Sequence, residues 1–303
     1  MNRTTNATEV RHIIGGAGSL SLRNVAGRVR LSGTDGEEVV VRCVGGRGDP
    51  PSLNVERSEG GLLVEPQRNR GRFFGLGLDV DGSLDFDVQL PRGARLDVKT
   101  VSADVDGESL LGEQNYKSVS GDVRLRGVAG RVSVMTVSGD VRLHEGGELA
   151  LDGATTSGDF TVEASRLHML GVRTVSGDIR LLARLEPGPR HAVETVSGDL
   201  HVESAGGVSV ESTRALDIGR RDRQPVVVGD GSARLVFRTM SGDSTVTLGP
   251  AQAAPPATEA RPAVPPAALA GELVGQDRLD VLRALERGEI GIEEASQRLE
   301  GMR

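Results

Sequence analysis

The residues of this chain best able to do chemistry are aspartates and serines that recur at nearly constant spacing. In each repeat one serine and one aspartate belong to a short unit that reads Thr-Val-Ser-Gly-Asp followed by an aliphatic residue, with small departures such as Ala103 in place of Gly. Successive aspartates are separated by 18, 18, 19, 19 and 21 residues, and a last copy follows after a gap. Regularly placed carboxylates could bind a cation, catalyse glycoside hydrolysis or hold a turn. The units occupy residues 100–105, 118–123, 136–141, 155–160, 174–179, 195–200 and 239–244.

The even spacing predicts the elements that must carry these residues. Self-similarity at a period of about 20 residues is typical of solenoids. After each aspartate apolar and polar residues alternate, as in Val123-Arg124-Leu125, which favours a strand with one buried face. A second strand signal lies between units, at residues 131–135 and 168–172. We therefore expect an all-β fold, a single parallel β-helix or β-solenoid with coils of 18–21 residues, plus a small C-terminal α-hairpin.

Stacked coils would convert the repeat into columns of side chains. In one arrangement Ser and Asp share an outward face beside Arg; in the other, Gly-Asp forms a corner with Gly at positive φ. The structural interpretation is that Asp and Ser satisfy turn amides and Arg neutralises the aspartates; the functional one is a ligand-binding ladder. Both stay open, and the predicted rod presents a polar Thr, Ser, Asp and Arg face. The candidate face residues are Ser120, Asp122, Arg124, Ser138, Asp140, Arg142, Ser157, Asp159, Ser176, Asp178, Arg180, Ser197 and Asp199.

Calcium and catalysis are both disfavoured by what accompanies the aspartates. Calcium-binding β-rolls carry Asp on both turns of each coil, whereas here the other turn reads like Gly127-Val128-Ala129-Gly130, which leaves too few oxygen ligands. A polysaccharide-acting β-helix enzyme is the alternative function, but the chain has no Trp to stack on sugars. The five histidines follow no triad or metal spacing. We expect no catalytic residue, no cofactor and no metal.

One segment departs from the repeat pattern and is a candidate contact loop. Basic residues next to two phenylalanines could touch an anionic membrane surface or a partner, or the Phe pair could cover one end of the solenoid. The loop residues are Arg68, Arg70, Arg72, Phe73 and Phe74.

Composition bounds the function classes and the location. The net charge is −7 and the 36 Lys and Arg are scattered, which argues against nucleic acid as the main partner. The single Cys43 permits no internal disulfide and is interpreted as a small core residue. The first 18 residues resemble no secretory signal and no apolar run is long enough to span a membrane, so we expect a cytoplasmic, envelope-associated protein.

Composition also divides the chain into domains. We predict a disordered N-terminus at residues 1–9, a solenoid at 10–248 with a cap region at 10–95 and the repeat ladder at 96–248, a Pro/Ala-rich linker at 249–272 and a helical hairpin at 273–303. The region before the repeats reads as further coils or a capping sheet, and residues 202–238 as one or two degenerate coils. Helices this short are marginal alone, so the hairpin packs on itself, or on a second copy or a protein partner.

The ladder from Thr100 to Leu200 resembles the bacterial "putative adhesin" family, a domain of unknown function built of β-strand repeats. Residues 86–93, a strand that ends in a Pro-Arg-Gly turn, resemble the family's strand before the ladder, and the resemblance extends over residues 10–248. The tail at residues 282–295 is similar to short helical-hairpin modules attached to such proteins. The resemblance implies adhesion or an envelope-linked role and brings no catalytic residues. We expect a non-catalytic scaffold or adhesin-like binding protein.

Overall fold

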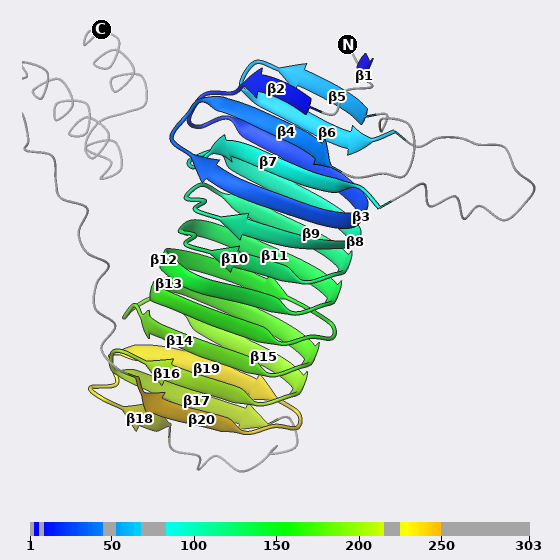
Figure 1. Cartoon of the computed structure of the whole chain (residues 1–303). Coiled ribbons are helices and arrows are strands. Elements are labelled where there is room, and N and C mark those ends of the chain that lie inside the picture. Colours follow the sequence, from blue (N-terminus) through cyan, green and yellow to red (C-terminus); the bar gives the residue numbers. More distant parts are fainter. Residues whose placement is uncertain (1–2, 6–8, 45–52, 68–82, 215–224, 250–303) are drawn as a thin grey trace, which may run out of the picture. The chain divides into compact units, whose positions relative to one another are not determined.

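Every element that the structure describes is a β-strand. The computed structural model describes residues 3–5, 9–44, 53–67, 83–214 and 225–249 (Figure 1). No helix in these ranges is long and apolar enough to cross a membrane. The all-β part of the prediction is confirmed, whereas the linker, the helical hairpin and the Arg/Phe loop lie outside the described residues.

The strands follow one another along the chain with short turns. The first group is β1 (Arg3–Thr5), β2 (Glu9–Ile13), β3 (Ser19–Thr34), β4 (Glu38–Val44), β5 (Leu53–Ser58), β6 (Gly61–Pro66) and β7 (Asp85–Pro91). The middle group is β8 (Arg95–Glu108), β9 (Gln114–Ser120), β10 (Val123–Arg126), β11 (Gly130–Ser138), β12 (Val141–Ala154), β13 (Phe160–Ser176), β14 (Ile179–Leu185), β15 (His191–Ser197) and β16 (Leu200–Ser204). The last group is β17 (Val208–Arg214), β18 (Val226–Val228), β19 (Ala233–Thr239) and β20 (Ser244–Leu248).

Most of these strands pair in parallel in two runs, which we call ladder A and ladder B. Ladder A holds the strands that follow each Asp: β7, the second half of β3 and of β8, β10, the first half of β12 and of β13, then β14, β16 and β20. Ladder B holds the strands that precede each Ser-Gly-Asp: β6, the first half of β3 and of β8, β9, β11, the second half of β12 and of β13, then β15, β19 and β17. One strand from each ladder forms one level of the stack visible in Figure 1.

Antiparallel strands extend both ends of the ladders, so the sheet is mixed. At the N-terminal end β4 pairs with β7, β2 with β4, β5 with β6 and β1 with β5, all antiparallel. At the other end β18 pairs antiparallel with β17. The prediction of a single parallel arrangement is therefore too simple, because the end strands of a stack expose unpaired edges that antiparallel hairpins can cover. Strand β1 also lies within residues 1–9, where disorder was expected.

Chain order and spatial order differ at both ends. Strand β3 lies between β7 and β8 in ladder A, and β19 lies between β15 and β17 in ladder B. Consequently the backbone N–H of Asp243 bonds directly to the carboxylate of Asp199, although 44 residues separate them. Residues 202–238, predicted as one or two degenerate coils, do form strands at 208–214 and 226–228, but they add no level between Asp199 and Asp243. The intervening chain forms strand β17, its hairpin partner β18, and β19.

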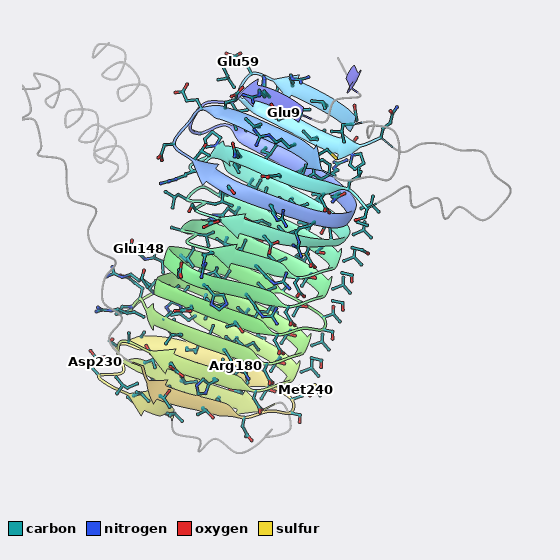
Figure 2. The ribbon with its side chains drawn as sticks, in the orientation of Figure 1. Glu9, Glu59, Glu148, Arg180, Asp230 and Met240 are labelled. Carbon is teal, nitrogen blue, oxygen red and sulfur yellow. The ribbon has the colours of Figure 1, made fainter. Side chains whose placement is uncertain are left out.

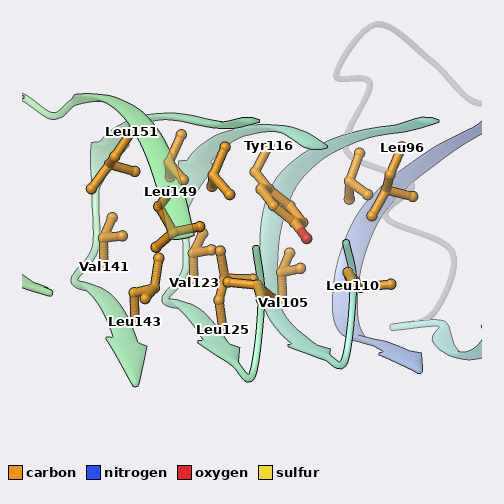
Figure 3. Packing of buried hydrophobic residues seen from close by; sticks show 14 of the residues in the cluster. Leu96, Val105, Leu110, Tyr116, Val123, Leu125, Val141, Leu143, Leu149 and Leu151 are labelled. Carbon is orange, nitrogen blue, oxygen red and sulfur yellow. The ribbon is translucent and has the colours of Figure 1, made fainter. Parts of the chain in front are cut away.

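A thin aliphatic core lies between the two ladders. Figure 3 shows Val123 and Leu125 of ladder A facing Tyr116 of ladder B, and each is 1% exposed. Tyr116 donates its hydroxyl to Oε1 of the buried Gln114 at 3.0 Å, so the polar end of this large ring is satisfied inside the stack. The alternation predicted for Val-Arg-Leu places Arg124 on the outside, and the same face recurs at every level.

Candidate functional site: an aspartate ladder at the corner

Ser-Gly-Asp turns the chain from ladder B into ladder A. Strand β9 ends at Ser120 and β10 begins at Val123, so Gly121 and Asp122 form the corner between them. The glycines of six levels, from Gly121 to Gly242, have φ between +125° and +151°. A Cβ on any of them would lie 2.1–2.5 Å from a backbone oxygen of the preceding level. The corner arrangement, left open by the sequence, is thus the one adopted, and glycine is required by both dihedral angle and space.

At the corner the aspartate side chains link one level to the next. Oδ1 of Asp104 accepts a hydrogen bond from the backbone N–H of Asp122 at 3.0 Å, and Oδ1 of Asp122 accepts one from Asp140. The same bond recurs, at 2.8–3.0 Å, for Asp140 to Asp159, Asp159 to Asp178, Asp178 to Asp199 and Asp199 to Asp243. Each carboxylate thus supplies an acceptor to a backbone N–H at the turn. Charge-assisted bonds of this kind are stronger than neutral ones.

The arginines that follow the aspartates join two levels each in the first half of the ladder. Nη2 of Arg124 donates to Oδ2 of Asp122 at 2.6 Å, and its Nη1 lies 3.7 Å from Oδ2 of Asp104. Arg142 repeats the pattern with Asp140 and Asp122, at 2.7 and 3.5 Å. These guanidinium groups neutralise carboxylates that would otherwise repel one another.

The second half of the ladder lacks this compensation. Thr161 stands at the position of Arg142 in the next level, and His201 at the position of Arg180. Arg180, labelled in Figure 2, is exposed. Within the described part of the chain no ion pair involves Asp159, Asp178 or Asp199. The corner therefore changes from charge-paired to acidic along the stack.

The serines form a column on the outer side of the corner. Ser120, Ser138 and Ser157 are exposed and lie opposite one another in parallel register. Ser176 and Ser197 continue the column. In the described residues no other group accepts from or donates to the Oγ atoms of these five serines, so they do not satisfy turn amides.

The Thr and Val of each repeat face the opposite way from the predicted polar face: the Thr side chain points inward and the Val side chain points outward. The side chain at the Thr position is 3–8% exposed at all seven levels from Thr100 to Thr239, whereas the Val that follows is about half exposed. The Oγ1 of Thr136 donates to the carbonyl of Ser138 at 3.4 Å, and Thr155 bonds Ser157 in the same way. Thr174, Thr195 and Thr239 also turn inward, although their Oγ1 atoms have no hydrogen-bond partner among the described residues. The Val that follows each inward Thr must face outward, because neighbouring residues of a strand alternate. The outer face is therefore Val, Ser and Asp, not Thr, Ser and Asp.

Sequence reasoning missed the first level of the ladder. In register with Thr100 to Val105 lie Asn24, Val25, Ala26, Gly27, Arg28 and Val29. Gly27 has φ +111°, and the backbone N–H of Arg28 donates to Oδ1 of Asp85 at 2.8 Å. Asp85 thus performs here what Asp104 does two levels later. The signal was present as Val-Ala-Gly-Arg-Val, but Asn and Arg replace Thr and Asp, and the partner Asp85 is distant in sequence.

In the described ranges no cluster of three or more His, Cys, Asp or Glu side chains is positioned to hold a metal ion. Burial raises the pKa of the Cys43 thiol to about 11, which opposes a nucleophilic role. The contact-loop residues Arg68, Arg70, Arg72, Phe73 and Phe74 lie outside the described residues.

The fold and corner together define a class: an all-β repeat protein whose parallel levels are joined at Ser-Gly-Asp corners and cross-linked by aspartate carboxylates. The chain belongs to the Toastrack DUF4097 family, whose model matches residues 92–247. The matched residues include every Ser-Gly-Asp level from Asp104 to Asp243.

Solved structures that match this chain come from several bacteria. A "putative adhesin" from Bacteroides fragilis is 9% identical, with 78% of this chain and 95% of that chain covered and a TM-score of 0.44. A "putative cell adhesion protein" from Clostridium sporogenes is 10% identical, with 82% and 100% covered and a TM-score of 0.25. A "putative lipid binding protein" from Parabacteroides distasonis is 9% identical, with 79% and 98% covered and a TM-score of 0.26. None of the curated proteins matches the chain.

Proposed function

We propose that this chain is a non-catalytic β-solenoid scaffold or adhesin-like binding protein linked to the bacterial cell envelope. The observation that carries the proposal is the aspartate ladder, in which Oδ1 of each Asp from Asp104 to Asp199 accepts a backbone N–H of the next level. An Oδ1 fixed as an acceptor for the main chain is not available to a reacting group, and the same geometry recurs at every level instead of marking one reaction centre. The repeated carboxylates are instead used to hold a regular surface, which suits binding better than turnover.

The ladder A side of the corner supplies the binding surface in this proposal. Arg142 and Arg180 stand on it at levels two apart, with Thr161 between them. The parallel register fixes the spacing of their backbones, so a partner meets Arg180 and, beside it, the guanidinium of Arg142 that also pairs with Asp140 and Asp122. Backbones fixed in this way cost little ordering entropy on binding. A cytoplasmic chain, the location expected from the sequence, would meet the inner face of the membrane, whereas an exported chain would meet peptidoglycan.

The proposal is tested by co-sedimentation of the full chain with purified peptidoglycan sacculi and, separately, with phosphatidylglycerol/phosphatidylethanolamine vesicles. We expect the wild type to sediment with one of the two. We expect Arg142→Ala/Arg180→Ala to weaken that binding about tenfold, an effect of the size that one or two charged contacts provide. The matched control Arg131→Ala/Arg190→Ala removes the same charge at exposed positions off this surface and should bind like wild type.

Two outcomes would contradict the proposal. Absence of binding to both probes would remove the envelope link. Release of reducing sugar from a polysaccharide panel by the wild-type chain would support the alternative, a polysaccharide-acting β-helix enzyme.

A further inference from the structure

An apolar stripe runs along the outer side of the corner, beside the serine column. It consists of the residue that follows the buried Thr position, and it occupies the same place in eight consecutive levels. Seven of its members are 42–51% exposed, and Thr156 is exposed as well. We call this set the valine stripe: Val25, Val101, Val119, Val137, Thr156, Val175, Val196 and Met240. Met240 marks its last level at the right-hand edge of the stack in Figure 2.

A second column borders the stripe on the side away from the corner. It is formed by the residue two positions earlier, which lies on the same outer face of ladder B. The parallel register aligns its members as Arg23, Lys99, Lys117, Met135, Ala154, Arg173, Glu194 and Arg238. We call it the basic column, because Lys and Arg predominate toward both ends, although Glu194 lies between Arg173 and Arg238 and pairs with both. Its middle is apolar, and Met135 there is 52% exposed. An apolar centre with a charged periphery is the usual anatomy of a protein–protein interface.

The length of the valine stripe sets how wide a surface a partner must cover to form a stable interface. Seven steps of about 4.8 Å make the stripe about 34 Å long, but a single side chain is too narrow to form a stable interface alone. Stable interfaces bury about 800 Å² on each partner, which at this length requires a width of more than 20 Å. A partner must therefore also contact the basic column on one side and the Ser and Asp columns on the other.

We propose that two copies of this chain pair through the valine stripe, with their ladders parallel to each other. A second copy matches the stripe because it carries the same spacing between levels, so apolar groups meet along the whole length. An α-helix, with a pitch of about 5.4 Å, would lose this register within a few levels.

The charged columns on either side of the stripe favour a parallel over an antiparallel orientation of the two copies. A two-fold axis along the stack exchanges the two sides of the stripe, and it brings the basic column of each copy over the Ser and Asp columns of the other. A two-fold axis across the stack would oppose basic column to basic column. Equal levels then face each other, so Arg173 of the second copy would lie opposite Asp178, and Arg238 opposite Asp243. Both arginines pair with Glu194 in their own chain, and Glu194 itself would lie opposite Asp199.

The oligomeric state of the full chain in sedimentation equilibrium tests the pairing. We expect a dimer whose dissociation constant rises at least tenfold in Val137→Glu/Val175→Glu, since each change buries a carboxylate in the apolar centre. Lys117→Glu/Arg173→Glu should weaken the dimer as well and leaves the apolar centre intact. The control Ile13→Glu/Leu111→Glu alters hydrophobic residues that are 68% and 50% exposed away from the stripe, and should behave like wild type.

Circular dichroism melting separates loss of pairing from loss of folding, because the stripe variants should retain β-sheet spectra at low temperature. A monomeric wild type at 100 µM, or stripe variants that stay as dimeric as wild type, would overturn the proposal.

Cross-linking with a short bismaleimide tests the direction. Val25→Cys and Met240→Cys should each form cross-linked homodimers, whereas a mixture of the two should give no mixed product. A mixed product would overturn the parallel arrangement, since only an antiparallel pair brings the first level beside the last. The native Cys43 is buried, and its raised thiol pKa keeps it from reacting in the same experiment.

Discussion

At the scale of single residues, substitutions at Asp178 distinguish two effects of the ladder carboxylates. One is the hydrogen bond that each carboxylate accepts, and the other is the repulsion between their negative charges. Oδ1 of Asp178 accepts the N–H of Asp199 at 2.9 Å, and Asp178 lies between Asp159 and Asp199 without an ion pair in the described residues. Asp178→Asn keeps an acceptor and removes one of three neighbouring negative charges, so we expect stability equal to or above wild type at low salt. Asp178→Ala leaves the N–H of Asp199 without its acceptor and should cost about 1–2 kcal/mol. Urea denaturation of the three proteins measures both differences.

Salt provides the control for this comparison. High salt should erase any gain in Asp178→Asn, because it screens repulsion between exposed carboxylates, and should leave the loss in Asp178→Ala nearly unchanged. If Asn and Ala destabilise the chain equally, the carboxylate does not act through its hydrogen bond.

The corner glycines give a second residue-scale prediction. Gly139 has φ +140°, and a Cβ would lie 2.2 Å from the carbonyl oxygen of Gly121. Gly139→Ala should therefore cost more than about 3 kcal/mol, combining backbone strain with a clash against main chain that cannot retreat. Gly171→Ala is the matched change, since its nearest neighbour is a carboxylate oxygen of Asp152 at 3.3 Å and its φ is not positive. Equal thermal midpoints of the two variants would contradict the close approach between corners.

At the scale of elements, His191 makes the start of β15 sensitive to pH. Its ring is fully buried, with Nε2 2.9 Å from the carbonyl oxygen of Glu186 and Nδ1 without a partner. Burial lowers the pKa of His191 below its ordinary value, against the opposing pull of the Glu186 carbonyl and carboxylate. The unfolded chain then binds the proton more readily, so stability is full above about pH 6.5 and falls as the pH drops below it.

The measurement is the urea midpoint between pH 7.5 and 5. We expect His191→Gln to flatten the decline over this range. A wild-type midpoint that is constant over this range would contradict a neutral buried imidazole. Glu9, whose pKa is lowered by hydrogen bonds from Arg42 and Arg11, acts below this window.

Elements of the ladder could be predicted from sequence because one local pattern carries them. In Val123-Arg124-Leu125 the alternation assigns the buried face without any other information, and the constant spacing of Asp122 and Asp140 implies parallel register. The orientation of Thr136 could not be predicted, since both Thr and Val suit a strand. The inward hydroxyl bonds Ser138 at this level, but Thr174 and Thr195 turn inward without such a bond. The insertion of β19 between β15 and β17 depends on contacts between distant segments, which a local pattern does not contain.

At the scale of the folded unit from Met1 to Ala253, the two ends of ladder A differ in what covers them. Strand β7 is flanked by β3 on one side and by β4 on the other, and β2 continues beyond β4. Strand β20 pairs with β16, and the described residues place no further strand along its other edge. Since each level contacts only its neighbours, stability should vary along such a stack according to how many neighbours each level has.

Amide hydrogen exchange of the full chain, followed by mass spectrometry, should reveal this gradient. We expect Ser244–Leu248 to exchange fastest among the strands of ladder A, because β20 has one partner strand and only partly buried or exposed side chains. The segments of β12 and β13 around Val141 and Phe160 should exchange slowest, because both are buried and paired on two sides. Exchange in β7 should be slow as well, since β4 covers its outer edge. If β20 proves as protected from exchange as β12, its outer edge must be covered in solution. That result would contradict the expected gradient of stability along the stack.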